Sequence, residues 1–124
     1  MSSDKDFFNL HDTSQGILRE LGTGLTARIF VGEKTMLSIV TLLPNAAGAV
    51  HCHPEEQWGL LLEGTAVRIQ GDSEVSVEPG DFWYTPSGVM HGLRAGATGA
   101  RVLDIFSPPR EQYKRVGKGF ATEP

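Results

Sequence analysis

The chain lacks several features that mark common classes of protein. It has a single cysteine, Cys52, which excludes an intrachain disulfide framework. It has no apolar run long enough to span a bilayer, and its start, MSSDKDFFNL, has no apolar stretch behind a basic segment. Its 11 Lys and Arg residues are outnumbered by 15 Asp and Glu residues and form no basic cluster. We therefore expect a cytoplasmic protein without a membrane or nucleic-acid partner.

The sequence instead contains many short β-prone runs separated by turn residues, among them 15 Gly and 7 Pro. With 124 residues the chain is long enough for one core but not for two. This pattern predicts a single all-β sandwich or barrel. We expect an N-terminal tail or extra strand in residues 1–24, the barrel in residues 25–108, and a C-terminal segment in residues 109–124. That last segment should form a short helix or lie over the barrel mouth.

Some individual strands and turns can be predicted. An early strand is expected at residues 16–21, and another at residues 49–53, AVHCH. One hairpin is expected to turn at Glu63-Gly64 and a second at Gly71-Asp72, because acidic and glycine residues favour tight turns between β-prone runs.

Three histidines are the main functional signal. On a strand, residues i and i+2 point to the same face, so His51 and His53 would present two imidazoles side by side. His91 could bring a third from a stretch rich in glycine. Imidazole nitrogen suits Mn, Fe, Ni, Cu and Zn, so the set predicts a divalent transition metal site, with Mn, Fe, Ni or Zn as the candidate ions. The alternative is that the histidines fill hydrogen-bonded pockets.

These residues resemble the two motifs of the cupins, G(x)5HxH(x)3–4E(x)6G and G(x)5PxG(x)2H(x)3N. The first motif is met by His51, His53 and Gly64, with Asn45 in place of the first Gly. The second is met by Gly80, Pro86, Gly88 and His91, with Ala95 in place of Asn. The resemblance covers about residues 40–108 and implies a jelly-roll β-barrel with the metal ion inside.

The fourth metal ligand is the main departure from the cupin pattern. Glu55, Glu56 and Gln57 are the choices, and Gln57 stands at the spacing where the motif has Glu. An amide oxygen can bind a divalent ion without adding negative charge. If Gln57 faces the ion, Trp58 and Cys52 should both point away from it. We expect Cys52 to be a small buried residue.

The strand near the end of the barrel carries further candidates. Asp104 and Phe106 should share a face, and Asp104 either faces a polar cavity as a general acid or base, or is a structural residue. Arg110 either clamps a carboxylate or lies on the surface. Together with H51-x-H-P-x-E-Q57, this region is similar to small cupins that ketonise unsaturated monouronates in pectin and alginate breakdown. That resemblance implies catalytic roles for Asp104, Phe106 and Arg110.

The predicted function is metal-dependent isomerase or lyase chemistry on a small sugar-acid-like substrate. The alternatives are an Fe(II)-dependent dioxygenase and a non-catalytic barrel that binds small molecules. Three aromatic residues, Trp58, Trp83 and Tyr84, would stack on a sugar ring or serve the core or a subunit interface. An apolar sheet face predicts a homodimer, unless the N-terminal tail covers that face.

Overall fold

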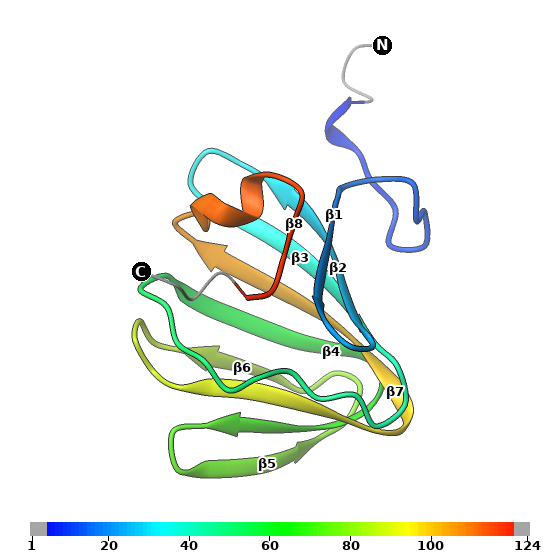
Figure 1. Cartoon of the computed structure of the whole chain (residues 1–124), viewed down its shortest axis with the longest axis vertical. Helices are drawn as coiled ribbons and strands as arrows, with labels where there is room; N and C mark the ends of the chain where they lie inside the picture. The colour runs from blue at the N-terminus through cyan, green and yellow to red at the C-terminus, as the bar shows by residue number, and fades with distance from the viewer. Residues whose placement is uncertain (1–4, 121–124) are drawn as a thin grey trace.

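The computed structural model describes residues 5–120, which form one eight-stranded sheet and a short 3₁₀-helix (Figure 1). The fold is all-β, as the sequence predicts. The elements are β1 (Ile17–Gly22), β2 (Leu25–Val31), β3 (Met36–Leu42), β4 (Glu56–Gln70), β5 (Ser73–Val77), β6 (Phe82–Thr85), β7 (His91–Ser107), η2 (Glu111–Lys114) and β8 (Gly117–Lys118).

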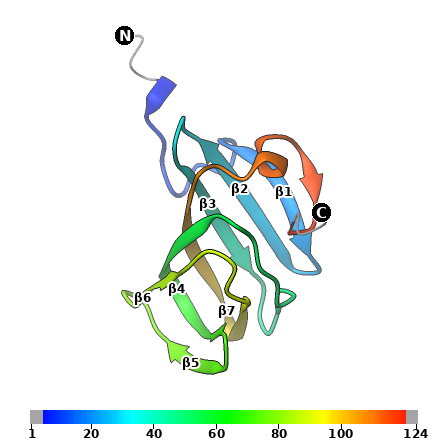
Figure 2. The same ribbon diagram turned by 90° about the vertical axis from the view of Figure 1, so that its left-hand side faces the viewer.

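The strands follow the order β5-β4-β7-β3-β2-β1-β8, and β6 pairs with the edge of β4 that faces away from β7. Figures 1 and 2 show the sheet bending so that the β1–β3 part and the β4–β7 part face each other. The segment between β3 and β4 runs along the open side of this arrangement. The barrel interior therefore lies between the two parts of one continuous sheet.

Alternating burial follows from the two-residue period of the strands. In β2 the side chains of Leu25, Ala27 and Ile29 are buried, while the residues between them are more exposed. The same alternation in β3 buries Met36, and in β4 it buries Leu61. The inward residues form one apolar core that lines and supports the cavity described below.

The predicted turn at Glu63-Gly64 is wrong, because β4 continues through it. β4 pairs with β7 along nearly its whole length, and the register shifts around residues 61–66 mark bulges. Gly64 has φ 83°, and a Cβ built on it would lie 2.0 Å from the backbone oxygen of Gly99. Glycine is thus required by the close approach of β7 and by a left-handed backbone, rather than by a chain reversal.

Three local predictions are confirmed: the early strand, the hairpin at Gly71-Asp72 and a short helix after the barrel. β4 and β5 form the hairpin at Gly71-Asp72, with Gln70 opposite Ser73. β1 covers the early strand and pairs with β2, and η2 is the short helix of the C-terminal segment. Among residues 5–120, no helix is long and apolar enough to cross a membrane.

Candidate metal centre

The segment that carries His51 and His53 is held against β7 by isolated bridges. His51 pairs with His91 through reciprocal backbone bonds of 2.9 and 2.8 Å, and Ala47 pairs with Arg94. Four steps separate residues 47 and 51 but only three separate residues 91 and 94, so one residue is extra and a regular ladder cannot form. The predicted strand at residues 49–53 is therefore wrong. The backbone pairing nevertheless brings the two histidine motifs together.

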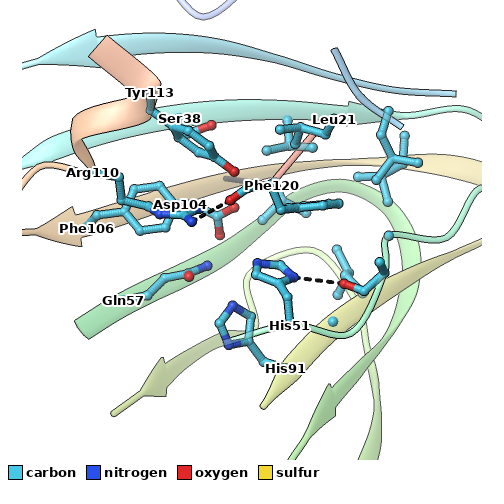
Figure 3. A pocket seen from close by; sticks show the side chains of 18 of the residues that line it. Leu21, Ser38, His51, Gln57, His91, Asp104, Phe106, Arg110, Tyr113 and Phe120 are labelled. Atoms are coloured by element: carbon cyan, nitrogen blue, oxygen red, sulfur yellow. Dashed lines mark hydrogen bonds between the residues drawn. The ribbon is translucent and has the colours of Figure 1, made fainter. Parts of the chain in front are cut away.

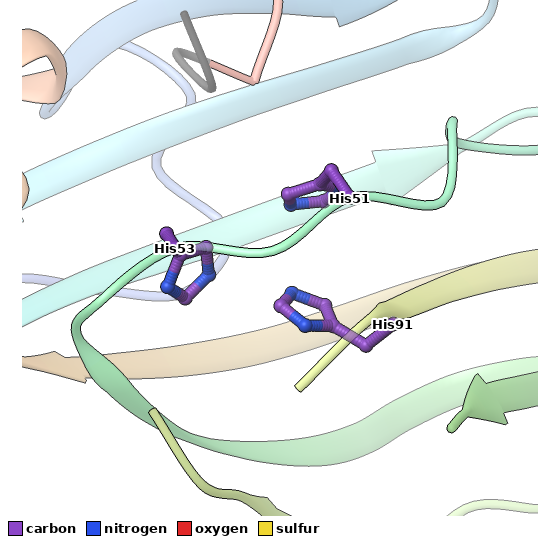
Figure 4. A group of neighbouring side chains, drawn as sticks. All are labelled: His51, His53 and His91. Atoms are coloured by element: carbon purple, nitrogen blue, oxygen red, sulfur yellow. The ribbon is translucent and has the colours of Figure 1, made fainter. Parts of the chain in front are cut away.

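The three imidazoles lie close together (Figure 4), and a backbone carbonyl orients each ring. The Nδ1 atom of His51 lies 2.8 Å from Ala49 O, that of His53 3.0 Å from Glu55 O, and that of His91 2.9 Å from Val89 O. A carbonyl only accepts, so each Nδ1 carries the proton and each Nε2 keeps its lone pair. The ligand atoms of the three residues all lie within 4.8 Å of one another. Three lone pairs thus gather in one small volume.

The environment keeps these imidazoles neutral. Burial is the main cause that lowers the pKa of His51 and of His53 to about 4 and that of His91 to about 3. The nearby guanidinium of Arg110 lowers the pKa of His51 and His53 further. Neutral imidazole is the form that binds a metal, so the cluster is ready for a cation at neutral pH.

Gln57 completes the cluster from β4. Its side chain is buried, its Oε1 lies 3.0 Å from His53 Nε2, and its amide hydrogen-bonds the carboxylate of Asp104. With the proton of His53 on Nδ1, Nε2 and Oε1 are both acceptors and cannot bond each other. Two ligands bound at right angles to one ion at about 2.1 Å would be about 3.0 Å apart. The donor set therefore fits a divalent transition metal.

The neighbouring acidic residues do not join this set. Glu56 accepts a 2.7 Å hydrogen bond from Tyr84 on the outer surface. Glu55 lies beside His53 Nδ1, the side of the ring away from the cluster, at 3.5 Å. Among the described residues, the histidines alone make up the metal-ligating group of His, Cys, Asp or Glu.

Trp58 points outward as expected, whereas Cys52 is exposed, so the prediction of a buried Cys52 is wrong.

The cavity next to the histidines contains the other predicted residues (Figure 3). Asp104, Phe106 and Arg110 all line it, with Val102 on the same face of β7. Arg110 is 1% exposed, so it is not a surface arginine. Its guanidinium lies over the ring of Tyr113, 4.2 Å from the centroid, and 3.8 Å from a carboxylate oxygen of Glu55.

Asp104 has an environment suited to proton transfer. Burial raises the pKa of Asp104 to about 6, while the charge of Arg68 and the hydrogen bond from Gln57 partly oppose this shift. A carboxyl with this pKa is present in both protonation states near neutral pH, which a general acid or base requires.

Sequence reasoning missed several of the lining residues, among them Arg68 and Ser38. Arg68 is buried, donates 2.8 Å to Thr85 Oγ1, and lines the cavity with His91. Ser38 is 1% exposed, stands opposite Asp104 in the β3–β7 ladder, and its Oγ has no hydrogen-bond partner within residues 5–120. Strand alternation would have placed Ser38 inward, but no local signal separates Arg68 from a surface arginine.

The three aromatic candidates do not line the cavity. Trp58 and Tyr84 form an exposed pair with ring centroids 4.9 Å apart. Trp83 lies partly buried, with Arg68 stacked 5.4 Å from its ring. None of them can stack on a sugar bound at the histidine cluster.

Comparison with known proteins agrees with this architecture. The profile of the Cupin_2 family, described as a cupin domain, matches residues 38–106, which is more than half of the chain. The chain therefore belongs to the cupin family. A solved structure of an RmlC-like cupin from Shewanella frigidimarina superposes with a TM-score of 0.75. It is 25% identical and covers 86% of this chain and 96% of that chain.

Two curated relatives point to different activities. The oxalate decarboxylase OxdC of Bacillus subtilis is 37% identical over 70 residues, which cover 52% of this chain but 18% of that protein. The pectin degradation protein KdgF of Dickeya dadantii is 28% identical over 97 residues, which cover 76% of this chain and 87% of that protein. The similarity to KdgF thus covers most of both chains, whereas the similarity to OxdC covers about half of this chain and a small part of the decarboxylase.

Proposed function

We propose that this protein is a metal-dependent isomerase or lyase for a small sugar-acid-like substrate, with ketonisation of an unsaturated monouronate as its reaction. The observation that carries the proposal is the position of Asp104 in the same cavity as the histidine cluster, with Gln57 linking the two. The ion, Mn, Fe, Ni or Zn, would act as a Lewis acid on a substrate oxygen. Its proposed ligands are His51, His53, Gln57 and His91.

Asp104 moves the proton in this proposal. Ketonisation takes one proton from an enol oxygen and places one on carbon, so it needs no oxidant or reductant. The carboxylate of Asp104 accepts the proton from oxygen, and the resulting carboxylic acid delivers a proton to carbon. A pKa of about 6 makes both steps accessible near neutral pH. Phe106, whose ring lies 5.6 Å from that of His53, gives the reacting atoms an apolar wall.

The charge of the cavity supports an anionic substrate. Arg68 and Arg110 both line it and are both buried, while the histidines are neutral and Asp104 is the one carboxylate among the described residues that line it. A guanidinium is suited to hold a carboxylate through paired hydrogen bonds. We assign that role to Arg110, which lies on the Phe106 side of the cavity.

The test is turnover of unsaturated galacturonate by protein loaded with Mn, Ni or Zn in anaerobic buffer. Proton NMR in D₂O should show loss of the vinylic signal and deuterium at the protonated carbon. Oxygen uptake with Fe(II) would instead identify a dioxygenase, and tight binding without turnover would identify a binding barrel. Release of CO₂ from oxalate, without reaction of the uronate, would favour the activity named for OxdC.

We also propose that the protein is a homodimer. Its outer sheet face exposes Trp58, Phe82 and Tyr84, and large exposed apolar patches mark interaction sites. The N-terminal segment packs elsewhere, with Phe8 against Phe30 of β2 at 4.8 Å. Light scattering at micromolar concentration should give about twice 13.4 kDa, and the monomer mass would refute the dimer.

A further inference from the structure

The C-terminal segment contributes an aromatic ring to the cavity. After η2 the chain forms β8 beside β1 and then places Phe120 over the histidine cluster (Figure 3). The Phe120 ring lies 4.3 Å from the ring of His51, with 32° between their planes. The ring therefore covers one face of a proposed metal ligand.

Two buried arginines fix this segment. The guanidinium of Arg19, on β1, donates to three backbone oxygens, at 2.8 Å to Gly119, 3.0 Å to Gln112 and 2.6 Å to Lys118. Arg19 is 5% exposed, so these bonds are shielded from water. Arg110 donates to the backbone oxygen of Phe120 itself. The backbone that carries the Phe120 ring is thus held by two buried guanidinium groups.

The opposite wall leaves space for the ring. A Cβ built on Gly48 would lie 2.9 Å from Cζ of Phe120, closer than side-chain contacts allow. Gly48 is held near β7 by a 3.1 Å bond from its N–H to Leu93 O, so it cannot easily move away. The ring is therefore seated between Gly48 and His51 by close packing.

We propose that Phe120 is a specificity-determining residue of the cavity and that Arg19 is its positioning residue. The ring limits the size of molecules that reach the Nε2 atoms of the histidines. It selects narrow monomeric substrates over larger ones. This inference rests on the proposed function only in that the same cavity receives the substrate.

The first test needs neither metal nor substrate. Metal-free protein is treated with diethylpyrocarbonate, and the modification rate of each histidine is measured by peptide mass mapping, with exposed His11 as the internal reference. Phe120→Ala should raise the rate at His51 roughly 2- to 12-fold, the range for losing one aromatic pair. Arg19→Lys should also raise the rate at His51, because a single ammonium nitrogen cannot reach the three carbonyls that the separate Nε, Nη1 and Nη2 atoms of Arg19 hold. Val116→Ala changes an exposed residue of the same segment and should leave the rate unchanged.

An unchanged His51 rate in Phe120→Ala would overturn the proposal. So would equal increases at His51, His53 and His91 in both Phe120→Ala and Phe120→Leu, because these would indicate general loosening. Phe120→Leu keeps an apolar side chain over His51, so its His51 modification rate should stay near that of the wild type.

The second test measures selectivity by calorimetry on metal-loaded protein, with acetate, galacturonate and digalacturonate as probes. Phe120→Ala should improve the affinity for digalacturonate relative to acetate severalfold, and an unchanged ratio would refute the role. If unsaturated galacturonate is not turned over but Phe120→Ala still raises the modification rate of His51, the proposed function is refuted while the role of Phe120 in limiting access is supported. If turnover occurs but Phe120→Ala changes neither the His51 modification rate nor the affinity ratio, only the role of Phe120 is refuted.

Discussion

Substitution of Ser38 should separate stability from function. Its hydroxyl is buried, opposes Asp104 and makes no hydrogen bond within the described part of the chain. A buried polar group without a partner costs about 1–3 kcal/mol, so Ser38→Ala should raise the free energy of unfolding by about 1–2 kcal/mol. For a domain of this size that is roughly 3–6 °C in Tm per kcal/mol. Urea and thermal unfolding of the metal-free protein measure both quantities.

Activity should change in the opposite direction. If Ser38 is left unpaired because it binds the substrate, Ser38→Ala should lower kcat/KM by roughly 10- to 150-fold, the range for a lost hydrogen bond to a charged group. Ser76→Ala, at an exposed serine of β5, is the matched control and should change stability by less than about 0.5 kcal/mol. A lower Tm with unchanged kcat/KM would refute the reasoning, because it would show that the hydroxyl has a structural partner.

Four further outcomes follow from the cavity and the sheet. Asp104→Asn should keep the fold and the metal but slow turnover by roughly 10²–10⁴-fold; wild-type turnover at normal metal content would remove Asp104 from the mechanism. His51→Ala should instead lose metal affinity, measured by elemental analysis after dialysis, and full retention would contradict its role as a ligand. Gly64→Ala should lower the free energy of unfolding by more than about 1 kcal/mol, because of its positive φ and the nearby Gly99 oxygen; an unchanged urea midpoint would show that β7 can move away. In metal-free protein the pKa values of the half-buried His51 and the buried His53 and His91 are lowered, so the unfolded state binds more protons than the folded state below pH 6.5. Stability should therefore be full above pH 6.5 and fall toward pH 4, and equal urea midpoints at pH 7 and 5 would contradict this.

The sequence predicts the fold class because spacing and alternation are local properties. The incorrect turn at Glu63-Gly64 has a physical cause. Glycine in a β-prone run marks either a reversal or a bulge, and the choice depends on whether another strand pairs across it. Here β7 does so, and this partner lies more than thirty positions away along the chain. Local sequence cannot distinguish these two cases.

Local sequence patterns likewise predict only some of the residues that line the cavity. The face shared by Asp104 and Phe106 could be predicted from strand period, and the structure does place both at the cavity. Phe120 and Arg68 could not be found this way. Phe120 reaches the site only because β8 pairs with β1, and Arg68 is buried only because β6 covers it through Thr85. Both depend on pairings between distant segments.

Gln57 connects the proposed metal ligands to the proposed proton-transfer residue, and its amide explains why Glu would serve less well in these roles. Its oxygen faces His53 while its N–H donates to Asp104. A glutamate at this position would have no proton to donate when ionised and would place a second negative charge beside Asp104. Like charges raise a carboxyl pKa, so Asp104 would stay protonated at neutral pH and could not accept a proton. With Gln57, the opposing effects of burial and Arg68 hold the pKa of Asp104 at about 6, where the carboxyl group can both accept and donate a proton.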